Sequence, residues 1–401
     1  MSEFLSGLSP SLLDVRFVAL LGGVVLLRIL FAKRWNAAIG AAASALIIGI
    51  ASWQTLALIG GTMLFIAYPL VLAMRRARQR KSGEHPGRVY LVVGVAVIVA
   101  LWVAFKVQKR FTLPFLEGTS VPAMLAGILG FSYYLFRVIN FLYMHYLVDI
   151  PERSPARALY YAIFPSTLTS GPIHKYLDFC KELDAPQPPS MDNLAEGVYR
   201  ITKGYFFKIC IAAAIDAVSN RLLLIQAPNA YQSIATIACL YLYFFFDFAG
   251  YSHIAIGIGL LLGVRVPENF RQPFLSTSVT EFWRNWHVTI GDWFRDHVFI
   301  PLGGMRLGGI RAASLAAGIM VACGFWHDVT IPFACWGLWH GSMLFLEGVT
   351  GSRPMPPPAR HGPVYWSRVA FTNARIALGA IFFLPKLDQA TAILGGMLRW
   401  W

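Results

Sequence analysis

Charged residues are scarce in this chain of 401 residues, since only 13% are Asp, Glu, Lys or Arg against roughly a quarter in soluble proteins. Apolar residues make up 57%, so a soluble globular protein is not expected. Acidic residues are the scarcer kind, at 20 against 34 basic ones, which gives a net charge of +14. Such an excess often indicates nucleic-acid binding. Here the basic residues lie in short clusters between apolar stretches, which favours a lipid bilayer as the partner and no nucleic acid.

Cysteines and familiar cofactor motifs are also few. The five cysteines are odd in number and scattered, which predicts neither a disulfide framework nor a cysteine metal site. The sequence holds no Walker A loop and no HExxH pattern. We therefore predict no metal and no tightly bound cofactor. Glu3 and Asp14 precede the first apolar run, so we expect no cleaved signal peptide and a first segment that stays in the protein.

Long apolar stretches dominate what is present. A helix needs about 20 largely apolar residues to cross a bilayer core. About eleven stretches approach this, some of them too short to span and therefore re-entrant candidates: residues 15–32, 37–52, 54–74, 89–105, 121–147, 156–170, 197–218, 231–263, 312–325, 331–348 and 369–385. The sequence predicts an all-α, polytopic membrane protein. Basic clusters at 75–81 and 106–110 flank one of these stretches, so the positive-inside rule leaves the absolute orientation open.

Residues 264–311 interrupt this pattern with interleaved polar and aromatic residues. Ser278 and Glu281 have the spacing of a capping box that opens a helix. Aromatic and aliphatic residues then recur at helical spacing, which predicts one amphipathic helix over residues 278–300. It carries the pair Trp286-His287. We expect this helix to lie at the membrane interface or against the bundle.

Residues 312–348 are apolar apart from a few polar side chains, of which His327 is the deepest in its run. An ionisable group at membrane depth costs roughly 2.5 to 3.5 kcal/mol on insertion scales, so its presence needs a reason. A neutral imidazole satisfied by one backbone carbonyl is a structural alternative to a functional role. His340 repeats the Trp-His pair, but Pro332 is expected to interrupt the segment, so the two histidines are not assigned a common face. Asp247 is a further buried acid, for which structural pairing with a cation is favoured over a polar path.

Several motifs in order carry a family resemblance. The chain contains Phe164-Pro165, Ser170-Gly171-Pro172-Ile173, Phe246-Asp247-Phe248-Ala249-Gly250-Tyr251-Ser252, Pro267-Glu268-Asn269-Phe270, Glu281-Phe282-Trp283-Arg284, Trp286-His287, Pro301-Leu302-Gly303-Gly304 and Gly324-Phe325-Trp326-His327. Together they resemble the membrane-bound O-acyltransferase family, in its bacterial branch that modifies teichoic acids and alginate. The resemblance covers residues 125–348 of what we expect to be a single domain over residues 1–401. Asp328 departs from the family pattern, which usually has Gly after this Trp-His pair.

The resemblance implies helices around a central funnel or tunnel, in the bacterial cytoplasmic (inner) membrane. It implies an acyltransferase that takes an acetyl or D-alanyl group from a cytoplasmic thioester, either an acyl carrier protein or acetyl-CoA. The acceptor would be a hydroxyl of a cell-envelope polymer or of an exported protein. The family's characteristic histidines map onto His327, the essential one, and His287. Trp286, Trp326 and Asp247 are the candidate substrate-binding residues.

The chemistry is consistent with that assignment. Acyl transfer to an alcohol needs a base, and a neutral imidazole with a pKa near 6.5 takes the hydroxyl proton at neutral pH. No serine or cysteine lies in a nucleophile motif, which favours direct transfer over an acyl-enzyme. We therefore expect His287 and His327 to face each other across one polar cavity. The alternative is a transporter or channel in which these histidines and Asp247 line a pathway.

Overall fold

A computed structural model describes residues 15–30, 36–80, 87–110, 128–148, 154–184, 190–351, 362–384 and 387–400, together with Ile150 and Met355. Helices are the only regular elements among these residues, apart from one isolated β-bridge. The predicted all-α class is confirmed for this part of the chain. The chain divides into an N-terminal unit (Ser2–Ile201 with Ala255–Pro267) and a C-terminal unit (Thr202–Ile254 with Glu268–Trp401).

The N-terminal unit is built from helices of very different lengths. They are α3 (Val15–Leu30), α4 (Ala37–Ala51), α5 (Trp53–Thr55), η2 (Leu56–Gly60), η3 (Met63–Ala67), α6 (Tyr68–Gln79), α7 (Arg88–Arg110), α9 (Phe131–Leu147), α10 (Pro155–Ala162), η5 (Pro165–Thr167), α11 (Tyr176–Asp184) and the start of α12 (Met191–Tyr205). Gly40 of α4 lies directly against the ring of Tyr160 in α10, where a Cβ would come within 2.4 Å of a ring carbon. The absence of a side chain there lets the two helices pack closely.

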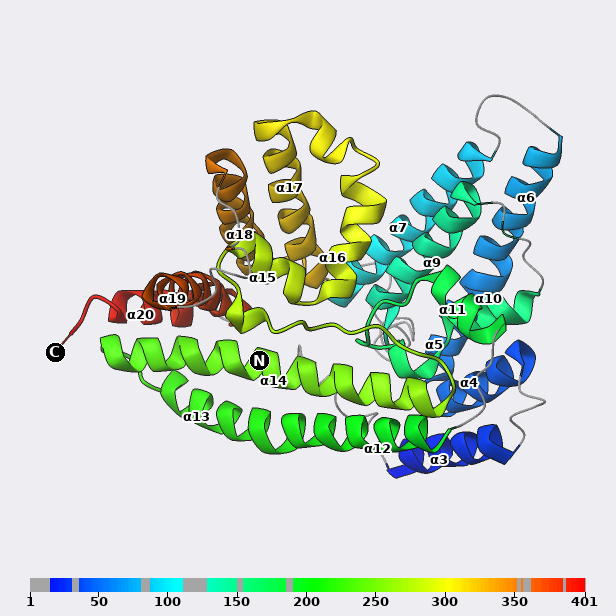
Figure 1. The fold of residues 1–401 in the computed structure, drawn as a ribbon, viewed down its shortest axis with the longest axis horizontal. Coiled ribbons are helices and arrows are strands. Elements are labelled where there is room, and N and C mark those ends of the chain that lie inside the picture. Colours follow the sequence, from blue (N-terminus) through cyan, green and yellow to red (C-terminus); the bar gives the residue numbers. More distant parts are fainter. Residues whose placement is uncertain are drawn as a thin grey trace. The chain divides into compact units, whose positions relative to one another are not determined.

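The C-terminal unit holds the rest of the chain's helices. These are η6 (Phe206–Ala212), α13 (Ala213–Leu223), most of α14 (Ala230–Leu261), η7 (Pro273–Leu275), α15 (Val279–Asn285), α16 (Val288–Phe294), η8 (Arg295–Phe299), η9 (Gly304–Leu307), α17 (Gly309–His327), α18 (Ile331–Thr350), α19 (Gly362–Leu378), η11 (Gly379–Phe383) and α20 (Leu387–Gly396) (Figure 1). Its apolar core joins α14, α15, α18, α19, η11 and α20 through Ile237, Leu240, Tyr241, Val279, Phe282, Met343, Ile376, Ala380, Ile381, Ala390 and Ile393.

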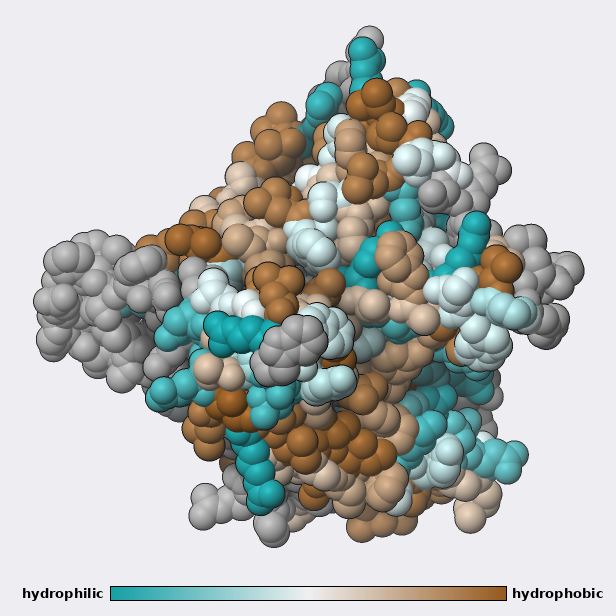
Figure 2. Space-filling view, turned by 90° about the vertical axis from the view of Figure 1, so that its left-hand side faces the viewer, coloured by the Kyte–Doolittle hydropathy of each residue, from teal (hydrophilic) through white to brown (hydrophobic). Residues whose placement is uncertain are grey.

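Four helical segments among the described residues are long and apolar enough to cross a membrane: Trp53–Gln79, Arg88–Gln108, Ala230–Leu261 and Gly309–His327. Many large apolar side chains on the described helices are exposed, and Figure 2 shows hydrophobic residues in broad areas of the face in view. Both features are typical of a membrane protein. The count of about eleven segments stays a prediction, and so does the central tunnel. Among the shorter apolar stretches, residues 156–170 form only the helix α10, which has 8 residues, and the turn η5.

Candidate functional site

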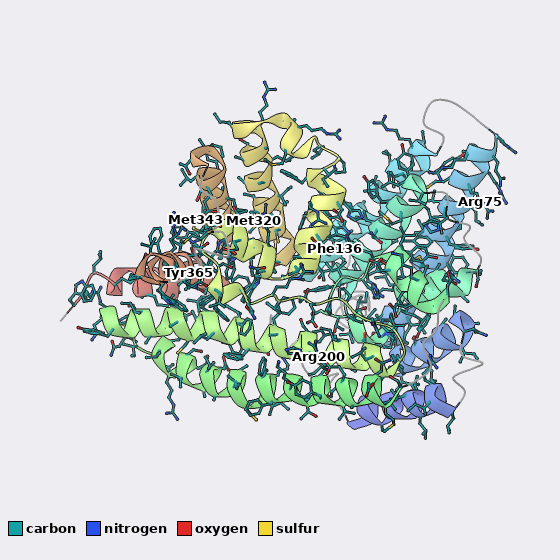
Figure 3. All side chains as sticks on the ribbon, viewed as in Figure 1. Arg75, Phe136, Arg200, Met320, Met343 and Tyr365 are labelled. Atoms are coloured by element: carbon teal, nitrogen blue, oxygen red, sulfur yellow. The ribbon has the colours of Figure 1, made fainter. Side chains whose placement is uncertain are left out.

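Small residues bring α17 and α18 together and so fix the position of His327. A Cβ on Gly324 would lie 2.3 Å from the carbonyl oxygen of Phe333, and one on Gly337 would lie 2.7 Å from the Cα of Val321. Such close backbone approach is the usual way in which membrane helices associate. Figure 3 labels Met320 of α17 and Met343 of α18, both of which are buried.

His327 is the last residue of α17, so it lies at a helix end and not within the apolar run. The predicted interruption at Pro332 is wrong in position, because the break lies at residues 328–330 and Pro332 belongs to the first turn of α18. Proline is well tolerated there, since the N–H it lacks would have no partner within the helix. Asp328 follows in extended conformation, and its carboxylate accepts a hydrogen bond from the backbone N–H of Val329 at 3.0 Å.

Aromatic rings surround the imidazole of His327. Its centroid lies 4.7 Å from that of Trp326 and 5.3 Å from that of Trp336. Phe333 stacks on it at 5.7 Å, and Phe383 of η11 lies at 5.5 Å. Trp326 itself is 6% exposed. These contacts come from three elements, so the side chain is held in a largely apolar, rigid environment.

The single amphipathic helix predicted over residues 278–300 is wrong, because the chain breaks at Trp286 and His287 into α15 and α16. The capping box that starts it is confirmed in its main contact, since the Ser278 hydroxyl accepts from the backbone N–H of Glu281 at 3.1 Å. The Glu281 carboxylate accepts from the backbone N–H of Thr277 at 2.8 Å, one residue before the expected position. The sequence therefore predicts where the helix starts, but it does not predict where the helix is interrupted.

His287 occupies a left-handed conformation with φ of 47°, which is uncommon for a residue other than glycine. The neighbouring backbone is held by an antiparallel bridge between Phe270 and Trp286 and by the Val288 N–H, which donates to the Asn269 carbonyl at 2.9 Å. Strained conformations of this kind persist only where the surroundings enforce them, and they are frequent at functional sites.

The Asn269 side chain orients the imidazole of His287. Its amide oxygen accepts from the Thr289 hydroxyl at 2.7 Å and lies 3.2 Å from His287 Nδ1, while its amide N–H donates to Ser252 at 3.1 Å. The Asn269 amide oxygen only accepts hydrogen bonds, so its contact with the imidazole requires a proton on Nδ1. This network therefore assigns the proton of His287 to Nδ1. His287 Nε2 then carries the lone pair. Phe248 covers the ring at 4.7 Å.

Burial, together with a smaller effect of the nearby imidazole of His327, lowers the pKa of His287 to about 3. His287 is 6% exposed and is therefore neutral at physiological pH. The electrostatic effect also means that the two predicted histidines lie within range of each other in the C-terminal unit. A shared polar cavity between these two histidines stays a prediction.

The other two predicted site residues have structural contacts. Trp286 stacks on Phe282 at 5.4 Å and on Tyr241 at 6.2 Å, so it packs against the apolar core. Asp247 forms a buried ion pair with Lys208, and this confirms the preference for pairing with a cation. Lys208 lies in the π-helical turn η6. The helix that contains this turn packs closely against α14, because a Cβ added to Gly204 or to Gly250 would lie within 2.8 Å of the carbonyl oxygen of the other glycine.

Sequence reasoning missed three contributors to this region. Asn269 belongs to the motif Pro267-Glu268-Asn269-Phe270, and the sequence assigns it no role in the site. In the structure it is fully buried and anchors His287. Trp336 and Phe383 had no motif signal at all, and both contact His327. His340, to which the sequence assigns no role, also belongs to this cluster, since its ring lies 4.8 Å from that of Trp336. Only the aromatic richness of residues 325–339 hinted at such a cluster.

Comparisons with known proteins identify the family of this chain. The model of the membrane-bound O-acyltransferase family matches residues 129–383. The probable alginate O-acetylase AlgI of Pseudomonas putida is 32% identical over 323 residues, which are 78% of this chain and 65% of that protein. The teichoic acid D-alanyltransferase of Bacillus subtilis is 29% identical over 236 residues, which are 56% of this chain and 59% of that protein.

The peptidoglycan O-acetyltransferase of Helicobacter pylori is 29% identical over 248 residues, which are 60% of this chain and 46% of that protein. The chain therefore spans between about half and two thirds of the length of these curated relatives.

Proposed function

Because this chain belongs to the membrane-bound O-acyltransferase family, we propose that it transfers an acyl group from a thioester to a hydroxyl of a cell-envelope polymer. One observation supports this most directly. The family match includes both His327 and His287, and these two histidines lie within electrostatic range of each other among aromatic side chains. Relatives named for alginate, teichoic acid and peptidoglycan share polymer acceptors that carry hydroxyl groups.

The proposed reaction uses His327 as the general base. Its imidazole takes the proton of the acceptor hydroxyl while the oxygen attacks the thioester carbonyl carbon. The resulting tetrahedral species expels the thiolate as the C–S bond breaks, and the imidazolium returns the proton to sulfur. The thiol and the new ester leave. Such base catalysis typically contributes roughly 10² to 10⁴ in rate.

His287 has a different part in this proposal. With its proton on Nδ1 and bound towards Asn269, its Nε2 accepts hydrogen bonds and does not donate them. It therefore orients the acceptor hydroxyl and does not stabilise an oxyanion. The Trp286 ring packs in the apolar core and is only partly exposed. In this proposal Trp286 therefore contacts the substrate only through the part of its ring that stays exposed. Asp247 supports the site through its ion pair with Lys208.

Acetyl is the acyl group that we favour over D-alanyl. Relatives named alginate O-acetylase are 32 to 34% identical to this chain, whereas the teichoic acid D-alanyltransferases are 29% identical. The donor is then a cytoplasmic acetyl thioester such as acetyl-CoA, with an acyl carrier protein as the second candidate. The protein would reside in the bacterial inner membrane, between this donor and an extracytoplasmic polymer or acyl-accepting protein.

Thioester turnover by the purified protein in lipid nanodiscs tests the proposal. We expect thiol release from acetyl-CoA that depends on an added polysaccharide acceptor, with the acetyl group recovered as an ester. D-alanyl carrier protein offered in parallel decides between the two donors. A transporter or channel would release no thiol from either donor, and that result would overturn the proposed function.

A further inference from the structure

Two buried ring nitrogens belong to side chains that are in contact in the C-terminal unit, and neither is used by the proposed mechanism. They are Nε1 of Trp283 in α15 and Nδ1 of His340 in α18, and no described residue offers either of them a hydrogen bond. The rings are in edge contact, with centroids 5.0 Å apart. His340 is 1% exposed. Because buried polar atoms nearly always have a partner, a pair of neighbouring exceptions points to a partner from outside the chain.

The chemistry of the two atoms defines that partner. The indole N–H of Trp283 only donates, whereas Nδ1 of a neutral imidazole donates or accepts according to the tautomer. A hydroxyl group suits both cases: its oxygen accepts from both nitrogens, or it accepts from Trp283 and donates to His340. A carbonyl oxygen suits only the tautomer with a proton on Nδ1. The pair therefore fits a hydroxyl better than a carbonyl.

The location relates this pair to the proposed base. The Trp336 ring lies 5.5 Å from Trp283, 4.8 Å from His340 and 5.3 Å from His327, measured between centroids. One indole thus separates the two unpartnered nitrogens from the His327 imidazole. The backbone of Gly379 lies beside the other ring nitrogen of His340, since a Cβ there would lie 2.3 Å from Nε2. The two side chains therefore belong to the same aromatic cluster as the proposed base.

We propose that Trp283 and His340 form a subsite for a second, non-reacting hydroxyl of the acceptor, so that the enzyme selects polyols over monohydric alcohols. This inference rests on the proposed function, because it assigns the acceptor of that same reaction. The subsite adds specificity without taking part in the proton transfer. A site that hydrogen-bonds a substrate hydroxyl discriminates against analogues that lack it, because its buried polar groups are then left without a partner.

The test combines protein variants with acceptor analogues. A hexopyranoside acceptor and its monodeoxy analogues are compared by kcat/KM in the full-length protein. One deoxy analogue should lose roughly threefold to tenfold with the wild type, the effect of one hydrogen bond. In Trp283→Phe, which removes the N–H and keeps an aromatic ring, the same analogue should be within about twofold of its parent.

Matched variants make the outcome specific. Trp293→Phe, on α16 with its ring stacked on His297 at 4.6 Å, should keep the full penalty for the deoxy analogue. His340→Leu should reduce the penalty to about twofold, and His340→Asn should restore part of it because its amide replaces Nδ1. An equal penalty in the wild type, Trp283→Phe and His340→Leu overturns this inference alone, as would be found if the two nitrogens held a structural water. Absence of any turnover in the wild type overturns the proposed function and this inference with it.

Discussion

At the scale of single residues, the two histidines differ in what holds them. Aromatic rings surround His327, which is partly exposed, whereas His287 is buried and held by Asn269. A base must move a proton, and a residue fixed in one tautomer is better suited to orientation. This difference supports His327 as the base and His287 as the positioning group in the proposed reaction.

His287→Ala should lower kcat/KM roughly tenfold, less than the loss expected for His327→Ala. The reason is that the variant loses one orienting hydrogen bond and keeps the base. Thiol release in matched membranes measures both effects. If the loss for His287→Ala were the larger of the two, the roles assigned here would be reversed.

The depressed pKa of His287 predicts an acid-sensitive fold. In the unfolded chain this imidazole binds a proton near pH 6.5, but in the folded protein it does so only near pH 3. Stability is therefore fully present above pH 6.5 and is lost as the pH falls towards 3, by up to about 1.4 kcal/mol per pH unit. Thermal unfolding between pH 7 and 4 should show a steeper decline for the wild type than for His287→Gln. Equal slopes would contradict the assignment.

At the scale of elements, the break between α15 and α16 positions His287, and Asn269 supports that break. Asn269→Ala removes the partner of both Thr289 and His287 and leaves buried polar atoms unsatisfied, at a cost of about 1 to 3 kcal/mol. We expect a lower melting temperature and a loss of activity at least as large as in His287→Ala. Asn285→Ala is the control, because the Asn285 side chain makes only a 3.3 Å contact with Ser276. Equal effects from the two variants would exclude a special role for Asn269.

The α17–α18 hairpin gives a second test at this scale. Gly337→Ala places a Cβ 2.7 Å from the Cα of Val321, so the helices must separate and the ring contacts of His327 with Trp336 must shift. Activity should fall by more than tenfold, in line with the sensitivity of catalysis to small displacements. Gly318→Ala on α17, where a Cβ meets nothing within 4 Å, should leave activity unchanged and stabilise the helix slightly. Similar losses in both variants would argue against the role of the close contact.

At the scale of the whole molecule, the sequence predicted the class of structure better than its local geometry. The apolar stretches predicted helices, and the capping box marked the start of α15, because both signals depend on neighbouring residues. The break at His287 depends on Asn269, which is 18 residues away, and on a left-handed backbone that the helical spacing did not reveal. The partner of Asp247 was likewise hidden, since Lys208 lies 39 residues earlier.

The same limit applied to the candidate site. Motifs identified His287 and His327, but the position of each depends on packing. The close approach of α17 and α18 positions His327, and the bridge between Phe270 and Trp286 holds the backbone beside His287. The aromatic ring of Trp336, which lies against both His327 and His340, carries no sequence signal because apolar membrane helices commonly contain tryptophan. Long-range packing, which one sequence does not display, supplied these details.

Hydroxyl-dependent thiol release from an acyl thioester by the His327→Ala protein is the most direct measure of whether His327 is the general base. We expect a rate at least tenfold below that of the wild type, and roughly 100-fold below it if the imidazole makes the usual contribution of a general base. Normal thermal unfolding would show that the variant folds. The control is His297→Ala on η8, whose ring stacks on Trp293 outside the site and which should retain activity. A folded His327→Ala protein that retained more than about a tenth of the wild-type rate would contradict the account.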